Sequence, residues 1–140
     1  MQIHGSCVAR EGAGVVLLGP PGCGKSDLAL RLLECGFVLV ADDRIDITDG
    51  IASPPAALAG LLEVRGLGIL RLPHVGQVMP VLAVTLAEAP DRLPCPRRDA
   101  VLDLPLIAID PRAASAALRI ARALDYLEGR IGQVAGAFVP

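Results

Sequence analysis

The chain of 140 residues is long enough to bury one hydrophobic core and leaves little room for a second domain. Hydrophobic residues make up 53% of it and aromatic residues only 2%, so leucine, valine, isoleucine and alanine must build that core. The formal net charge of −2 shows no basic excess, which argues against nucleic acid as the main partner. No apolar run approaches the roughly 18 to 20 residues of a membrane span, and no signal peptide is evident, so we expect a cytoplasmic protein without a membrane partner.

Strand and helix patterns alternate in the first third of the chain. Residues 3–8 and 15–18 are predicted strands, the second of them short and buried. Residues 26–35 form a predicted helix that Gly36 ends, with an apolar face made of Leu28, Ala29, Leu32 and Leu33. Residues 37–41 are a further strand, which we expect to be parallel and adjacent to strand 15–18 in a right-handed unit.

The rest of the chain is less regular. Asp49-Gly50 predicts a tight hairpin turn between two short strands. A short helix or turn at 56–62, a strand at 81–86 and an exposed, proline-rich loop at 87–98 are expected in that order. Asp110 and Pro111 are typical of a helix start, and this helix should run to Glu128 and stop at Gly129. The fold class predicted by these elements is α/β.

One loop identifies the class of ligand. Residues 19–26 match the phosphate-loop pattern G-x-x-x-x-G-K-[ST], with a strand before and a helix after. Backbone N–H groups of such a loop cradle nucleotide phosphates, while Lys25 reaches the terminal phosphates and Ser26 offers a hydroxyl to Mg²⁺. The candidate nucleotide-binding residues are therefore Gly19, Pro20, Pro21, Gly22, Cys23, Gly24, Lys25 and Ser26.

Carboxylates must decide the chemistry, because a phosphate loop does not by itself specify a reaction. Asp42 and Asp43 directly follow strand 37–41, whose carboxyl end should face the nucleotide. Such a pair can supply a Mg²⁺ ligand and a base for an attacking hydroxyl, although it can equally be a turn-forming pair that starts the hairpin. Glu63, after an apolar pair, is either a further Mg²⁺ ligand or a solvated surface acid.

Four segments carry a resemblance to a known family: His4-Gly5, the phosphate loop, Val40-Ala41-Asp42-Asp43, and residues 62–69, which read Leu-Glu-Val-Arg-Gly-Leu-Gly-Ile. In this order they resemble the C-terminal catalytic domain of HPr kinase/phosphorylase, over residues 2 to 110. That bacterial enzyme phosphorylates a serine of HPr, the phosphocarrier protein of the sugar phosphotransferase system. The resemblance implies a P-loop nucleotide-binding fold with a mixed sheet and a C-terminal helix.

The resemblance also implies ligands and roles. ATP and Mg²⁺ would be bound, with Lys25 on the β- and γ-phosphates and Ser26 and Glu63 on the metal. The proton acceptor falls in the Asp42-Asp43 pair, and we favour Asp43 with Asp42 in support.

Further active-site residues implied in the same way are His4, Arg65 and Arg92. The partner would be HPr or its nitrogen-type paralogue, and the assembly a homo-oligomer, which the family suggests is a hexamer.

Two departures from the family pattern stand out. Residues 1–140 read as one catalytic domain without the family's N-terminal regulatory domain, which resembles the truncated forms of alphaproteobacteria. Residues 109–115 also lack the proline–glycine–arginine–asparagine segment associated with removing phosphate from HPr, so we expect weak phosphorylase activity at most. A small-metabolite P-loop kinase and a nucleotide-sensing regulator without turnover are the alternatives.

Overall fold

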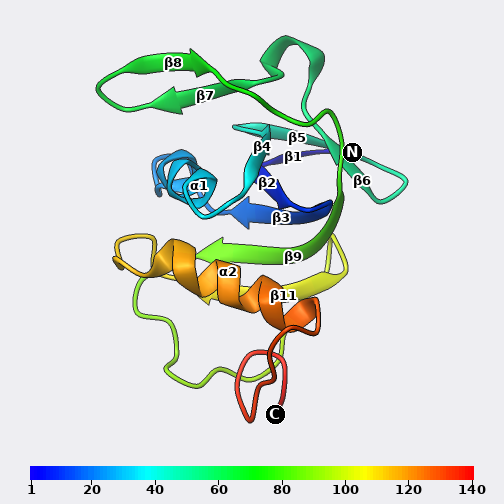
Figure 1. Cartoon of the computed structure of the whole chain (residues 1–140), viewed down its shortest axis with the longest axis vertical. Helices are drawn as coiled ribbons and strands as arrows, with labels where there is room; N and C mark the ends of the chain where they lie inside the picture. The colour runs from blue at the N-terminus through cyan, green and yellow to red at the C-terminus, as the bar shows by residue number, and fades with distance from the viewer.

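The computed structural model describes all residues from 1 to 140, and a six-stranded mixed sheet lies at its centre (Figure 1). The strand order is β10-β11-β9-β3-β2-β4, where the bounds are β10 Arg98–Asp99, β11 Leu104–Ile109, β9 Met79–Leu86, β3 Ala13–Leu18, β2 Ser6–Arg10 and β4 Val38–Ala41. Strands β3, β9 and β11 are parallel, whereas β2 runs antiparallel to both of its neighbours. The predicted α/β class and mixed sheet are confirmed.

Two smaller sheets flank the central one. β1 (Gln2–His4), β5 (Arg44–Thr48) and β6 (Ile51–Ser53) form an antiparallel sheet in the order β1-β5-β6. A short 3₁₀ helix, η1 (Ala56–Leu58), leads into the hairpin of β7 (Leu61–Val64) and β8 (Gly68–Arg71), which projects beyond α1 in Figure 1. The predicted Asp49-Gly50 turn joins β5 to β6, and both of its residues have positive φ, as a tight hairpin turn requires.

Alternation along β3 explains why this strand is apolar throughout. Val15 and Leu17 face a large core shared with the helices α1 (Lys25–Leu33) and α2 (Ala116–Leu127). Val16 faces the other way, into a second core beneath β5 and β6. Because side chains alternate between the two faces of a strand, a strand covered on both sides must be apolar at every position.

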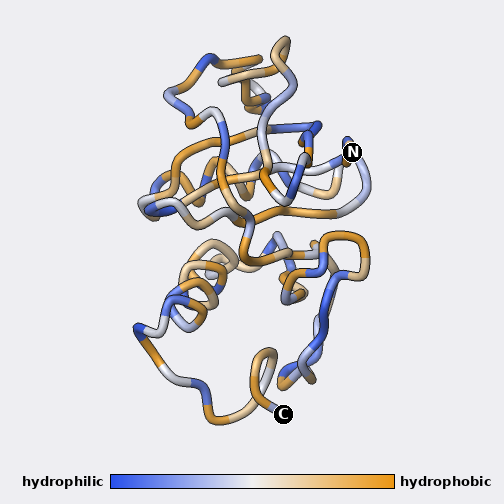
Figure 2. The backbone as a smooth tube through the Cα atoms, turned by 90° about the vertical axis from the view of Figure 1, so that its right-hand side faces the viewer, coloured by the Kyte–Doolittle hydropathy of each residue, from blue (hydrophilic) through white to orange (hydrophobic).

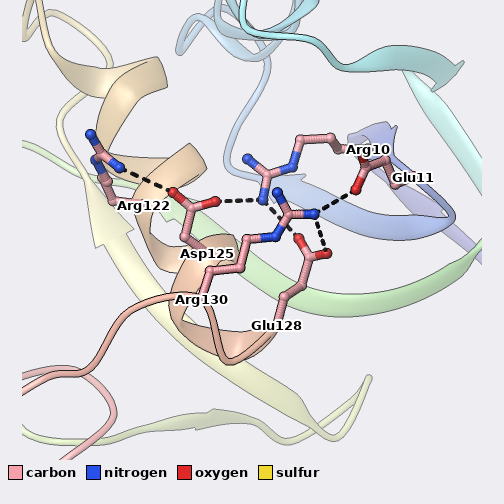
Figure 3. A network of polar contacts seen from close by, with 6 residues as sticks. All are labelled: Arg10, Glu11, Arg122, Asp125, Glu128 and Arg130. Atoms are coloured by element: carbon pink, nitrogen blue, oxygen red, sulfur yellow. Dashed lines mark hydrogen bonds and ion pairs between the residues drawn. The ribbon is translucent and has the colours of Figure 1, made fainter.

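Charged side chains tie the end of α2 to the turn between β2 and β3 (Figure 3). The Arg10 guanidinium donates hydrogen bonds of 2.7 Å to the carboxylates of Asp125 and Glu128. Arg130 donates to Glu11 at 2.5 Å, so both arginines connect residues more than a hundred positions apart in the chain. The hydrogen bond from Arg10 holds the pKa of the Asp125 carboxyl below its usual range.

Two expectations about the N-terminal half are wrong. Residues 3–8 do not form one strand. The strand is interrupted at Gly5, and the two parts, β1 and β2, belong to different sheets. A side chain at Gly5 would lie 2.7 Å from the carbonyl oxygen of Leu17, so only glycine fits this crossing. Strand β4 runs in the same direction as β3 but is not adjacent to it, since β2 lies between them.

The predicted start of the last helix is also wrong. The Asp110 carboxylate accepts the N–H of Arg112 at 2.9 Å, which closes a turn instead of capping a helix. Arg31 of α1 donates to the carbonyls of Pro111 and Ala113, which lie in the turns before the helix. The helix α2 therefore begins at Ala116 and ends, as predicted, before Gly129.

The remaining elements of the structure agree only partly with the prediction from the sequence. Strand β11 was not predicted, and residues 87–97 form the expected loop, while Arg98 belongs to β10. No helix of the chain is long and apolar enough to cross a membrane.

Candidate nucleotide and phosphoryl-transfer site

The phosphate loop lies between β3 and α1, as its sequence predicts. Gly22 and Gly24 have φ values of 78° and 104°, a backbone conformation that other residues adopt only under strain. These conformations let the loop turn back on itself before α1, so that the N-terminal N–H groups and dipole of the helix point toward the loop. The local structure is that of an anion-binding loop.

Lys25 is buried and folded into this loop. Its ammonium donates hydrogen bonds to the carbonyl oxygens of Gly19, at 2.6 Å, and Pro20, at 2.9 Å. Its Nζ also lies 3.8 Å from the thiol of Cys23, a half-buried loop residue. Lys25 is the only lysine of the chain, so a single ammonium serves the loop.

Ser26 connects the loop to the first of the paired carboxylates. Its hydroxyl is shared between the two carboxylate oxygens of Asp42, at 2.9 Å from each. Asp42 is 7% exposed and follows β4 directly, so the antiparallel pairing of β4 with β2 places this side chain. A third contact comes from Ser6, at the start of β2, whose buried hydroxyl donates to Asp42 Oδ1 at 2.6 Å.

Asp43 has a different environment from its neighbour. Its φ of 70° turns the backbone between β4 and β5, and its side chain is 65% exposed. The Nδ1 atom of His4 lies 3.8 Å from one carboxylate oxygen, and the Nε atom of Arg44 lies 4.0 Å from the other. The two adjacent carboxylates are thus separated into a buried one on the phosphate loop and an exposed one beside a histidine.

Three further candidates lie outside this cluster of hydrogen bonds. Glu63 is exposed on β7, on the strand face opposite the buried Leu62. Arg65 is exposed in the turn between β7 and β8, and Arg92 is exposed in the loop that follows β9. None of the three makes an ion pair within 4.0 Å, and no group of three or more histidine, cysteine or acidic residues is arranged to hold a metal ion.

Ser6 is the site residue that sequence reasoning missed. A serine at the start of a strand carries no signal of its own, and its role depends on the distance between β2 and β4. The position directly after His4-Gly5 was the one available hint.

The architecture and the loop together define a P-loop nucleotide-binding domain. A model of the family described as HPr Serine kinase C-terminal domain matches residues 1–80 of the chain. The chain belongs to this family.

Individual relatives agree with the family match. The HPr kinase/phosphorylase of Clostridium tetani is 41% identical over 87 residues, which are 59% of this chain and 28% of that protein. The HPr kinase/phosphorylase of Enterococcus faecalis is 41% identical over 74 residues, 49% of this chain and 24% of that protein. The chain therefore spans about a quarter of the length of these curated relatives.

A solved structure extends the likeness beyond residue 80. The Hpr(Ser) kinase/phosphatase from Coxiella burnetii superposes with a TM-score of 0.79 at 25% sequence identity. The superposition covers 93% of this chain and 97% of that one. The fold is shared over nearly the whole length of both chains.

Proposed function

We propose that this domain transfers the γ-phosphoryl group of ATP to a serine hydroxyl of HPr, or of its nitrogen-type paralogue. The observation that carries the proposal is the phosphate loop joined through Ser26 to the buried Asp42, in a chain of the HPr kinase family. Family members' names supply the partner, and the side chains described above support the chemistry.

Lys25 is the group proposed to bind the terminal phosphates of ATP. Its ammonium is held by two neutral carbonyl oxygens, and a phosphate oxygen is a stronger, charged acceptor for the same N–H donors. Exchange of these partners needs only a movement of the side chain, because the loop backbone is already curved around it. The glycines and the N–H groups of residues 19–26 would complete the phosphate cradle.

The oxygens of Ser26 and Asp42 suit Mg²⁺, which prefers hard oxygen ligands and keeps several waters. We assign Glu63 as a further ligand from the family resemblance. When bound, the metal neutralises charge that develops on the phosphate oxygens during transfer. Ser6 keeps the Asp42 carboxylate oriented toward Ser26 through its own hydrogen bond.

Asp43 is the proposed base. It is the exposed member of the carboxylate pair, so the serine of a protein substrate can reach it, whereas Asp42 is engaged by two hydroxyls. Asp43 takes the proton of the substrate hydroxyl as that oxygen bonds to the γ-phosphorus and the bond from phosphorus to the departing ADP oxygen breaks. His4, 3.8 Å away, orients the Asp43 carboxylate.

Arg65 and Arg92 are assigned to the same reaction. Both guanidiniums are free of carboxylate partners, so they are available to bind phosphoryl oxygens or the substrate protein. We further propose a homo-oligomer, a hexamer by analogy with the family, and a cytoplasmic location shared with ATP and HPr.

Phosphoryl transfer tests the proposal directly. The full chain is incubated with γ-labelled ATP, Mg²⁺ and purified HPr, and phosphoserine on HPr is the expected product. Lys25→Ala should abolish transfer while the circular dichroism spectrum stays unchanged, and Arg122→Gln, at an exposed residue of α2 outside the site, should leave the rate intact.

The same mixture separates the alternatives. Label on a small molecule instead of HPr would support a metabolite kinase. ATP binding without any transfer would support a nucleotide-sensing regulator. Either result would contradict the proposed function.

A further inference from the structure

A cavity of about 1220 Å³ lies below α2, on the side of the molecule away from the β7–β8 hairpin. Its walls are the loop 87–97, strand β11, helix α2 and the C-terminal segment 131–138, which we call together the α2 cavity. In Figure 2 the C-terminal segment and the hydrophilic loop 87–97 stand on opposite sides below the helix. Hydrophobic residues supply 16 of the 27 that line it, so the cavity has an apolar interior exposed to water.

The walls are held in place by contacts that do not cross the cavity. Tyr126 of α2 stacks on Phe138 with ring centroids 4.7 Å apart. The side-chain oxygen of Gln133 accepts the N–H groups of Phe138 and Val139, which closes the C-terminal segment into a loop. Leu93 on the loop and Leu118 on α2 are 68% and 60% exposed. Large apolar side chains from two walls of the cavity are therefore exposed to water.

Strand β11 presents an open edge to this cavity. Leu106 donates its N–H outward to the carbonyl of Arg97, while the carbonyl of Ile109 points inward and accepts the N–H of Ala87. Because successive residues of a strand point their backbone groups to opposite sides, both the N–H and the C=O of Ala108 point outward. Strand β10 pairs only with Leu104 and Pro105, so Ala108 has no strand beside it. The N–H and C=O of Ala108 are therefore the groups at which a further strand can pair with this edge.

The charged residues that line the cavity favour a negatively charged segment at that edge. Four arginines line the cavity against two aspartates, in a chain whose net charge is −2. Asp110 is bound by Arg112 and Arg122 by Asp125, whereas Asp91 has no cationic partner within 4.0 Å. Arg92 and Arg97 on the loop wall and Arg119 on α2 have no carboxylate within 4.0 Å. Three guanidiniums without a carboxylate partner thus line the cavity, Arg92 and Arg97 from the loop and Arg119 from α2.

We propose that the α2 cavity binds an extended, acidic segment of a partner protein, which adds as a strand to the open edge of β11. Backbone hydrogen bonds to Ala108 would fix its register, alternate apolar side chains would fill the interior, and acidic side chains would meet Arg97 and Arg119. This site lies outside the phosphate loop cluster. Arg92, which we assign to the kinase reaction, also lines the cavity, so the test below varies only Arg97 and Arg119.

Peptide selection tests the inference without assuming the partner. A random 12-residue peptide library is selected on the full chain, with the Arg97→Glu/Arg119→Glu variant used to remove peptides that bind elsewhere. Synthetic peptides are then measured by fluorescence polarisation. We expect acidic sequences with apolar residues at every second position, and roughly ten-fold or greater weakening in the double variant, which corresponds to the loss of close charge pairs. Arg71→Glu, outside the cavity, is the matched control and should bind normally.

Backbone methylation separates strand addition from other binding modes. Each peptide N–H is methylated in turn, and loss of affinity should recur at every second position, because only alternate N–H groups face β11. Losses at spacings of three and four would indicate a bound helix and overturn the inference. Neutral or basic selected peptides would overturn it as well. So would concentration-dependent dimerisation in sedimentation experiments that the double variant abolishes, since the occupant would then be a second copy of the chain.

Discussion

The buried hydroxyl of Ser6 donates a 2.6 Å hydrogen bond to Oδ1 of Asp42, and this contact joins the start of strand β2 to the residue that follows β4. The same carboxylate accepts the hydroxyl of Ser26 from the phosphate loop. Asp42 is therefore oriented from two sides before any ligand arrives, and its geometry depends on both serines.

Removal of the Ser6 hydroxyl should make the orientation of the Asp42 carboxylate less fixed, while the residues that contact the nucleotide stay unchanged. We expect Ser6→Ala to raise the Mg²⁺ concentration for half-maximal activity by roughly ten-fold, the low end of effects seen for residues that orient metal ligands. Ser6→Thr keeps the hydroxyl and should restore the wild-type value. A variant that loses stability while its Mg²⁺ dependence stays unchanged would mark Ser6 as purely structural.

Substitutions of the two exposed acids of the proposed site, Asp43 and Glu63, should have different effects on the kinetics. Asp43→Asn removes the base, so turnover should fall by roughly two orders of magnitude or more while ATP binding is largely kept. Glu63→Gln should instead raise the Mg²⁺ requirement. Steady-state kinetics at several Mg²⁺ concentrations, with ATP binding measured separately, distinguishes the two. If both variants lose only nucleotide affinity, the roles assigned to them are wrong.

The hydrogen bond from Arg10 makes stability depend on pH through Asp125. The pKa of this carboxyl is lowered in the folded chain, so its stabilising effect is present above the unfolded pKa of about 3.9 and is lost as pH falls through the lower folded value. We expect Asp125→Asn to lower the melting temperature at pH 7 and to reduce the drop in melting temperature on acidification. Arg122→Gln removes an exposed partner of Asp125 and should change little. Equal pH profiles for wild type and Asp125→Asn would refute the assignment.

Phosphorylase activity should be weak. Removing phosphate from serine needs inorganic phosphate bound beside the phosphoprotein, and hence anion donors beyond those that serve ATP. The nearest candidate, Arg112, has both Nε and Nη2 at 3.2 Å from the Asp110 carboxylate and is already neutralised. Serine-phosphorylated HPr is incubated with the chain, inorganic phosphate and Mg²⁺, and pyrophosphate release should be at least roughly ten-fold slower than the kinase reaction, a barrier higher by about 1.4 kcal/mol.

A second variant tests whether the neutralised Arg112 is the reason for weak phosphorylase activity. Asp110→Asn removes the charge that occupies Arg112, so it should raise pyrophosphate release if a free cation is what the site lacks. Release by the unaltered chain at a rate near that of the kinase reaction would contradict the prediction.

Local patterns were enough for the features whose cause is local. The phosphate loop depends on glycines that permit positive φ, on Lys25 and on Ser26, all within eight consecutive positions. The Asp49-Gly50 turn and the end of α2 before Gly129 have the same kind of local cause. Family membership likewise followed from short motifs in a fixed order.

Features that join distant segments needed the tertiary structure. Strand β2 lies between β3 and β4 because of pairing along the whole strands, which no short motif records. The turns that precede α2, which begins at Ala116, are contacted by Arg31, about eighty residues earlier in the chain.

The sequence by itself determined the ligand class, the α/β architecture and the family, since glycine conformations, apolar periodicity and motif chemistry act over a few residues. The tertiary structure decided which of two adjacent aspartates is buried against Ser6 and Ser26 and which is exposed beside His4. It also created the α2 cavity from a loop, a strand edge, a helix and the C-terminal segment. Both outcomes depend on distances between strands and helices that only the packed core sets.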